Sequence, residues 1–133
     1  MTIARGRLTS VAALVVLIAV CAAQQSGPKF VELQRRAIPG TQLEGVTTVV
    51  EIAPGATSAR HSHPGEDFGY LIEGTIELYV DGKPPQTLKA GDVFFTGRGQ
   101  VHNARNIGTT PARAVDTYVI DKGKPGVIPA AAK

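Results

Sequence analysis

Two histidines separated by a single residue are the most chemically informative feature of this 133-residue chain. His61 and His63 flank Ser62 in a segment, Ala59–His63, that has the composition of a short strand. Successive side chains of a strand point to opposite faces, so two residues spaced in this way project on the same side. Because neutral imidazole is the commonest metal ligand, the pair could hold one metal ion. Taken alone, it is also compatible with a polar pair on a solvent-facing strand.

The surroundings of the pair form the first of two spaced motifs. Gly55–Gly74 reads G-x5-H-x-H-x3-D-x6-G, and Gly91–Asn106 reads G-x5-G-x-G-x2-H-x3-N. They resemble the two motifs of the cupin superfamily, which has glutamate at the position of Asp67 and proline at that of Gly97, and in particular small single-domain bacterial cupins. With its flanking strands the resemblance covers most of the chain. It implies an all-β fold, a double-stranded β-helix or jelly-roll barrel of one domain.

The resemblance also implies a set of metal ligands: His61, His63, Asp67 and His102. Asp67 keeps the strand parity of the histidine pair, whereas Glu66 is one position out of register. Aspartate is one methylene shorter than glutamate, and Pro64-Gly65 interrupts the strand, so Glu66 stays an alternative ligand. The replacement at Gly97 is expected to loosen the turn before His102, and Asn106 is interpreted as structural.

Three imidazoles and one carboxylate suit a single divalent transition metal ion. Fe, Mn, Ni, Co, Cu and Zn all fit this ligand set, and its chemistry does not choose between them. Calcium and magnesium prefer shells made of oxygen alone. An open coordination position would face a pocket and receive a small-molecule ligand or substrate.

Alternation along the expected strands suggests which residues line that pocket. Gly69 and Leu71 share the parity of Asp67, and Ala104 shares that of His102. Three charged residues could contact a polar substrate, although a solvated strand face explains each of them as well: Arg60, Arg105 and Asp116. Five aromatic residues are more typical of core or sheet surface than of ligand contacts: Tyr70, Tyr79, Phe94, Phe95 and Tyr118.

Short stretches rich in Val, Ile, Thr, Tyr and Phe alternate with Gly and Pro from residue 27 onward, which predicts many short strands. No segment has a sustained helical period. The expected strands are Lys29–Arg35, Thr47–Ile52, Ala59–His63, Phe68–Ile72, Thr75–Val80, Gln86–Leu88, Val93–Phe95, His102–Asn106 and Arg113–Ile120. The expected turns are Ala53-Pro54-Gly55, Pro64-Gly65, Glu73-Gly74 and Asp81-Gly82.

The first residues have the order of a secretory signal peptide. Arg5 and Arg7 precede an apolar run, Val11–Val20, and small residues follow it. The run is shorter than the roughly 20 residues of a permanent membrane span. Removal of residues 1–23 would make the protein periplasmic or secreted. An uncleaved anchor and a lipoprotein joined through Cys21 are the alternatives.

The expected organisation continues from that signal peptide. Residues 24–46 form an N-terminal arm and edge strand, residues 47–121 the barrel, and residues 122–133 a loose C-terminal tail. The full chain has 14 Lys and Arg against 11 Asp and Glu, and no basic run that would favour nucleic acid. The edge strand, with Val31-Glu32-Leu33-Gln34, favours a homodimer.

A barrel with one metal ion does not define a reaction. The first interpretation is a metal-dependent enzyme of the dioxygenase, isomerase or lyase type that acts on a small organic molecule. The alternative is a non-catalytic module of the cell envelope that binds a small ligand or the metal itself. A purely structural protein that assembles through its edge strand is a third reading.

Overall fold

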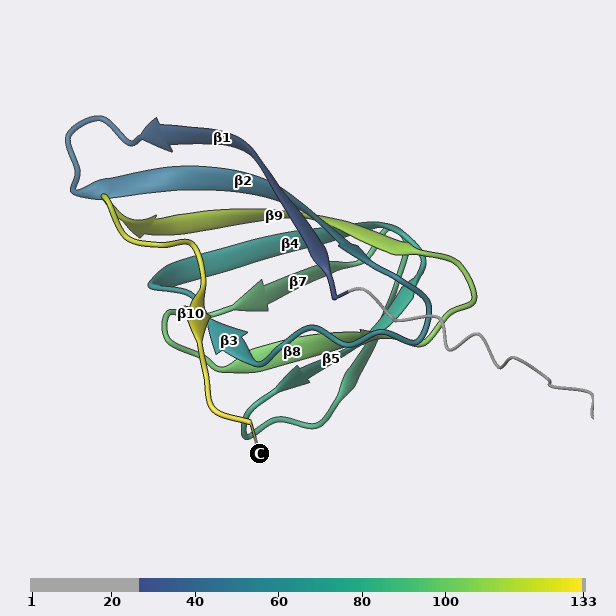
Figure 1. The fold of residues 1–133 in the computed structure, drawn as a ribbon. Coiled ribbons are helices and arrows are strands. Elements are labelled where there is room, and N and C mark those ends of the chain that lie inside the picture. Colours follow the sequence, from purple (N-terminus) through teal and green to yellow (C-terminus); the bar gives the residue numbers. More distant parts are fainter. Residues whose placement is uncertain (1–26, 133) are drawn as a thin grey trace, which may run out of the picture.

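Residues 27–132 are described by a computed structural model, in which they form two five-stranded antiparallel sheets that face each other (Figure 1). The strand orders are β1-β2-β9-β4-β7 and β10-β3-β8-β5-β6. The strands are β1 (Lys29–Ala37), β2 (Leu43–Ile52), β3 (His61–Ser62), β4 (Gly65–Glu73), β5 (Thr75–Val80), β6 (Gln86–Lys89), β7 (Val93–Thr96), β8 (His102–Asn106), β9 (Ala112–Asp121) and β10 (Ile128–Pro129). From β2 onward the chain repeatedly crosses between the sheets, which confirms the expected single-domain double-stranded β-helix.

Alternation along the long strands places one buried, mostly apolar row between the sheets. On β2 and β9 every second residue is buried, and Val46 and Tyr118 stand directly opposite each other in that row. The period of two that predicted these strands therefore also places the core. The core side chains form three clusters: Leu71, Ile76, Leu78, Leu88, Ala112 and Ala114; Val46, Tyr118 and Ile120; and Val50, Ile52 and Ala56.

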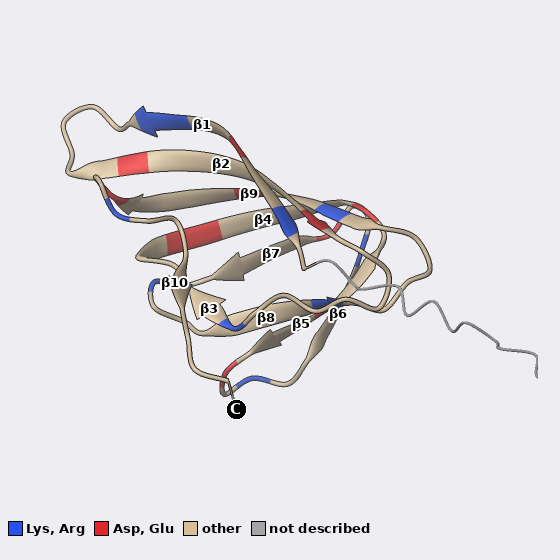
Figure 2. Ribbon diagram, in the orientation of Figure 1, with Lys and Arg blue, Asp and Glu red and all other residues tan. Residues whose placement is uncertain are grey.

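Charged residues of both signs are spread over the two sheets (Figure 2). Several pair across the surface, such as Lys29 with Glu51 and Arg98 with Asp121. Ion pairs as exposed as these contribute little to stability, so the fold depends on its apolar interior. Among residues 27–132, no helix is long and apolar enough to span a membrane. The expected signal peptide and Cys21 lie outside the described residues.

Two local expectations differ from the structure. The prediction of a turn at Pro64-Gly65 was wrong, because only Pro64 lies in a bend and Gly65 is already the first residue of β4. The tail is also not loose over residues 122–132. Its strand β10 pairs with β3, and the amide of Ala130 donates to the carbonyl of Arg60. The C-terminal segment thus completes the second sheet beside the histidine pair.

Asn106 and Gly65 show how the interior tolerates polar and small residues. The buried amide of Asn106 donates to the carbonyls of Ile52 and Thr110 and accepts from Gly108, which confirms its structural role. Gly65 packs directly against β9: a Cβ atom there would lie 1.9 Å from the carbonyl oxygen of Val119. That oxygen belongs to the backbone, so it cannot rotate away as a flexible side chain could.

Gly65→Ala is therefore expected to destabilise the protein by about 2 to 3 kcal/mol or more, as overpacking of a rigid site does. Gly45→Ala on β2 is the matched control, because Gly45 pairs with Val119 of the same strand β9 but has no atom within 4 Å of its Cβ position. Urea unfolding measures both variants. Equal stabilities of the two alanine variants would contradict the close packing of β4 on β9.

Candidate metal centre

The three histidines meet at one end of the barrel interior. His61 on β3 stands opposite His102 on β8 in the strand register, and His63 follows β3 directly. Ligand nitrogens of the three rings lie within 4.8 Å of one another. Two nitrogens that share an ion at about 2.1 Å each can be at most about 4.2 Å apart, so only a small inward adjustment is needed. The expected histidine cluster is confirmed.

Each imidazole is held by a backbone carbonyl on the side away from the cluster. The Nδ1 atoms of His61, His63 and His102 bond to the carbonyls of Ala59 at 2.8 Å, Gly126 at 2.6 Å and Gln100 at 3.0 Å. A carbonyl only accepts, so each Nδ1 carries the proton. The three Nε2 atoms are consequently left with free lone pairs, which is the tautomer that a metal ion requires.

Burial keeps these rings neutral. It lowers the pKa of His63 and of His102 to about 4, against the opposing effect of their carbonyl bonds, and lowers the pKa of His61. Proximity of the rings adds to the effect, since a charge on one would repel a charge on the next. Neutral rings need no deprotonation at physiological pH before they bind a metal.

The two acidic candidates point to opposite faces of β4. Asp67 is 1% exposed, and its Oδ2 lies 3.6 Å from Nε2 of His63 and accepts a bond from the hydroxyl of Thr96. Glu66 lies on the outer side, within 4.0 Å of Arg98. Asp67 thus has the orientation for an oxygen ligand, and its role as ligand stays a prediction.

The buried carboxyl of Asp67 is incompletely satisfied. Its Oδ1 has no hydrogen-bond partner among the described residues, and burial raises its pKa to about 7. A buried charge is costly without a partner. Asp67 lies outside the group of three histidines whose ligand atoms are within 4.8 Å of one another, although its Oδ2 is 3.6 Å from Nε2 of His63. The three imidazoles fit a metal ion, and an ion that also contacted Asp67 would supply the missing partner.

The turn before His102 is closed rather than loosened. The amide of Gly97, which a proline would lack, donates to the side chain of Gln100, and the amide of Gln100 donates back to the carbonyl of Gly97. The carbonyl of the same Gln100 holds Nδ1 of His102. The expectation of a looser turn was therefore wrong, because the glycine gains a hydrogen bond.

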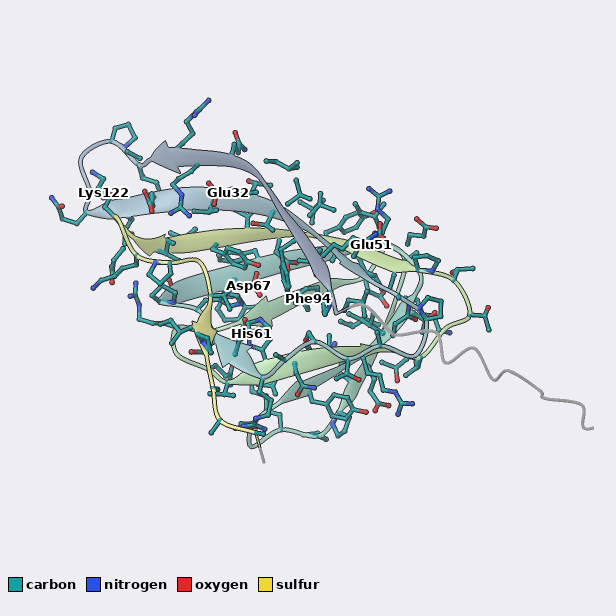
Figure 3. The ribbon with its side chains drawn as sticks, viewed as in Figure 1. Glu32, Glu51, His61, Asp67, Phe94 and Lys122 are labelled. Atoms are coloured by element: carbon teal, nitrogen blue, oxygen red, sulfur yellow. The ribbon has the colours of Figure 1, made fainter. Side chains whose placement is uncertain are left out.

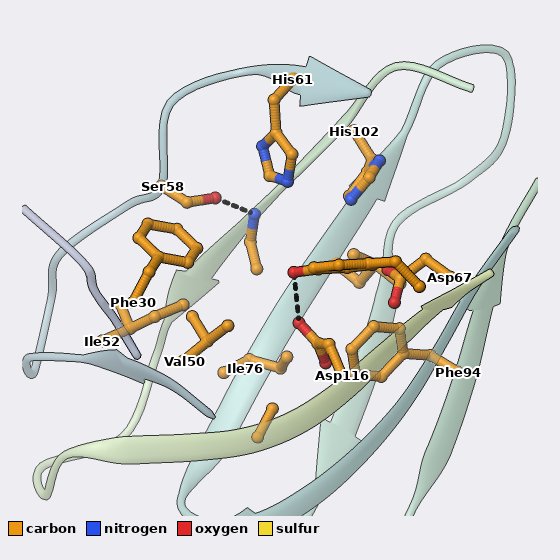
Figure 4. A pocket seen from close by; sticks show the side chains of 14 residues that line it. Phe30, Val50, Ile52, Ser58, His61, Asp67, Ile76, Phe94, His102 and Asp116 are labelled. Atoms are coloured by element: carbon orange, nitrogen blue, oxygen red, sulfur yellow. Dashed lines mark hydrogen bonds between the residues drawn. The ribbon is translucent and has the colours of Figure 1, made fainter. Parts of the chain in front are cut away.

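A small cavity of about 40 Å³ lies beside the histidines, between the two sheets (Figure 4). A buried water needs roughly 10 to 15 Å³, so the cavity holds about three. Its walls are mostly apolar and include Val50, Ile52, Ile76 and Phe94. Figure 3 shows that His61, Asp67 and Phe94 point into the barrel, whereas Lys122 lies at its periphery.

The cavity contains one acidic residue whose position the sequence left open. Asp116 is 7% exposed, and its Oδ2 accepts a long 3.5 Å bond from the hydroxyl of Tyr118. The ring of Tyr118 in turn stacks on His63. Burial, with the nearby Asp67, raises the pKa of Asp116 well above its usual range. The alternation of buried residues along β9 was the signal that could have identified it.

The other suggested pocket residues divide between several places. Ala104 lines the cavity as expected, whereas Leu71 belongs to the apolar core. Gly69 is covered by the ring of Phe94, which would lie 2.0 Å from a Cβ atom there. The two arginines, Arg60 and Arg105, line a separate surface depression that shares no residue with the cavity.

Comparison with known proteins agrees with the fold. Germin-like protein 5-1 of Oryza sativa subsp. japonica is 30% identical over 87 residues, which are 61% of this chain and 39% of that protein. A conserved protein with a double-stranded β-helix domain from Klebsiella pneumoniae subsp. pneumoniae has a TM-score of 0.65 at 28% identity, over 80% of this chain and 86% of the other.

A third similarity is to oxalate oxidase in complex with the substrate analogue glycolate, with a TM-score of 0.63 at 26% identity. It covers 80% of this chain and 56% of that one, so the chain spans only part of the germin-like protein and of oxalate oxidase. Residues 48–118, more than half of the chain, match the family described as Cupin domain. The chain belongs to the cupin domain family.

Proposed function

We propose that this cupin is a metal-dependent enzyme that acts on a small organic molecule. His61, His63, His102 and Asp67 would hold one divalent transition metal ion. The observation that carries the proposal is the arrangement of the three imidazoles, each with Nδ1 bonded to a carbonyl and Nε2 free, beside a mostly apolar cavity. A purely structural role would not require three neutral imidazoles with unpaired nitrogens in one place.

The bound ion would act as a Lewis acid that polarises a carbonyl or enolate of the substrate. The chain's own residues supply the surroundings. The mostly apolar walls offer few hydrogen-bond partners to water in the cavity, and Thr96 orients the Asp67 carboxylate through its 3.1 Å hydrogen bond. Tyr118 packs flat on His63 and restrains the tilt of that ring.

The similarity to oxalate oxidase supports an oxidoreductase over an isomerase or lyase, although identity is only 26%. The alternative of a non-catalytic binding module is favoured by the small volume of the cavity, which leaves room for few atoms beyond the ion. Export to the periplasm or medium and formation of a homodimer stay predictions. Exposed Val31 and Leu33 on β1 and the Phe68–Phe95 pair are the apolar surfaces on which a dimer would rest.

The double variant His61→Ala/His63→Ala is expected to lose stoichiometric metal and the rise in melting temperature that metal confers on the wild type, because an ion bound only by the folded state stabilises it. Asp67→Asn should weaken metal affinity by about tenfold or more, whereas Glu66→Gln, the outward neighbour, should leave it unchanged. Elemental analysis and chelator competition measure both effects. Unchanged metal content in the double variant would refute this ligand set.

In the metal-free protein, the stability contributed by the buried histidine and the stability contributed by the buried aspartate should change with pH in opposite directions. The pKa of His102 is about 4 when folded and ordinarily 6.5, so unfolding takes up a proton and the wild type loses this stability as pH falls through that window. The pKa of Asp67 is about 7 against an ordinary 3.8, so its contribution is lost as pH rises toward and through 7.

Relative to wild type, His102→Gln should therefore gain stability as pH falls from 6.5 to 4, and Asp67→Asn should gain as pH rises from 4 to 8. Urea unfolding of chelator-treated protein across this range measures both differences. Parallel curves for wild type and either variant would show that the corresponding group is not buried as described.

Catalysis itself is tested by loading the stripped protein separately with Mn, Fe, Co, Ni, Cu and Zn. Each form is offered oxalate, catechols, flavonols, diketones and hydroxy acids, with product detection by mass spectrometry and oxygen uptake. Turnover is expected with at least one combination, retained in Glu66→Gln and absent in His61→Ala/His63→Ala. Stoichiometric metal without any turnover would favour the binding module instead.

A further inference from the structure

The carboxyl of Asp116 is a buried acceptor that the metal centre does not use. It lies on β9 directly opposite Thr48 of β2 and Gly69 of β4, in the row that faces the barrel interior. Its Oδ2 accepts from Tyr118, whereas its Oδ1 has no hydrogen-bond partner among residues 27–132. Leaving a buried polar atom unpaired destabilises the fold, so this oxygen is available to a donor that enters the cavity, either a water or a group of a bound molecule.

The position of this oxygen defines what that partner is. Asp116 lines the same cavity as His61 and His102, and Figure 4 draws the two histidines on one side of that cavity and Asp116 on the other. A molecule bound to a histidine-held ion would therefore present its far end to Asp116. Phe94, whose ring occupies the space that a side chain on Gly69 would take, closes the wall beside it.

The charged residues around the cavity further restrict the chemical class of the ligand. Two carboxyls, of Asp67 and Asp116, line the cavity, and no Lys or Arg is among its lining residues. One bound divalent ion would offset the carboxylate that ligates it, but no Lys or Arg of residues 27–132 lines the cavity beside Asp116. A second negative group on the ligand at that end would be enclosed by mostly apolar walls that no Lys or Arg lines, which is unfavourable in a medium of low dielectric constant.

We propose that Oδ1 of Asp116 anchors the substrate at the end away from the metal by accepting a hydrogen bond from an uncharged donor, a hydroxyl or amide group. The substrate is then a small hydroxy or amide compound and not a dicarboxylate such as oxalate. This inference rests on the proposed metal site and deepens it. Three or so water-sized positions in the cavity limit the enclosed part of the substrate to a few non-hydrogen atoms.

Oxalate and oxamate test this anchor as a matched pair, since oxamate has the same number of non-hydrogen atoms but replaces one carboxylate by an amide. Binding to the zinc-loaded full chain is followed by NMR titration, with zinc retention checked by elemental analysis. Oxamate is expected to bind the wild type at least about tenfold more tightly than oxalate, because a tenfold difference in affinity corresponds to about one buried hydrogen bond.

Asp116→Ala, and Asp116→Leu as the variant closer in volume, should weaken oxamate about tenfold and leave oxalate unchanged or tighter. Asp116→Asn, which keeps an acceptor oxygen, should restore most of the oxamate affinity. Asp121→Asn is the control, because Asp121 lies on the same strand but is only partly buried, pairs with Arg98 and lies outside the cavity.

The outcomes separate the two proposals. A wild type that holds zinc but binds oxalate as tightly as oxamate, or whose oxamate affinity survives Asp116→Leu, overturns the anchor and leaves the metal site standing. A chain that retains no zinc overturns the metal site and, with it, the first point of attachment on which the anchor depends.

Discussion

The candidate site depends on three hydrogen bonds between imidazole Nδ1 atoms and backbone carbonyls. The carbonyls belong to Ala59, Gln100 and Gly126, which come from three segments far apart in the chain. Backbone carbonyls cannot donate, so they fix the tautomer as well as the ring orientation. The metal-binding geometry is thus built into the fold before any ion arrives, and its accuracy depends on how well the turn before β8 and the segment before β10 are themselves held.

Burial has opposite consequences for the two kinds of titratable group around the cavity. It keeps the imidazoles neutral, which suits metal binding, and it makes the carboxyls of Asp67 and Asp116 costly to ionise. A cation beside Asp67 would remove that cost there. Asp116 has no such compensation within the described chain, and natural proteins keep costs of this kind mainly where binding or catalysis requires them.

The strands and the shared side of His61 and His63 could be predicted from sequence because both follow from short-range regularities, whereas the barrel and the part played by His102 were implied by the resemblance of two spaced motifs to those of the cupin superfamily. Alternation with a period of two located the strands, and the spacing of His61 and His63 placed both rings on one side. The features that were missed depend on long-range packing. Nothing near Gly126 in the sequence indicates that its carbonyl accepts a hydrogen bond from His63. Glycine occurs both in turns and where two backbones approach closely, and Gly65 was predicted to be in a turn although the structure has it in a close approach.

The barrel fold positions the metal ligands, whereas the side chains that line the cavity determine which substrate fits. The histidines and their carbonyl partners are positioned by the strands and turns of the barrel. Other side chains form the cavity walls: Phe94 fills the space over Gly69 and reduces the volume, and Asp116 supplies an acceptor opposite the metal site that has no hydrogen-bond partner among residues 27–132. Residues on these walls can change without disturbing the ligands, because they lie on β7 and β9 while the histidines lie on or beside β3 and β8. Substrate preference in this chain should therefore follow Asp116 and Phe94 more closely than it follows the identity of the metal.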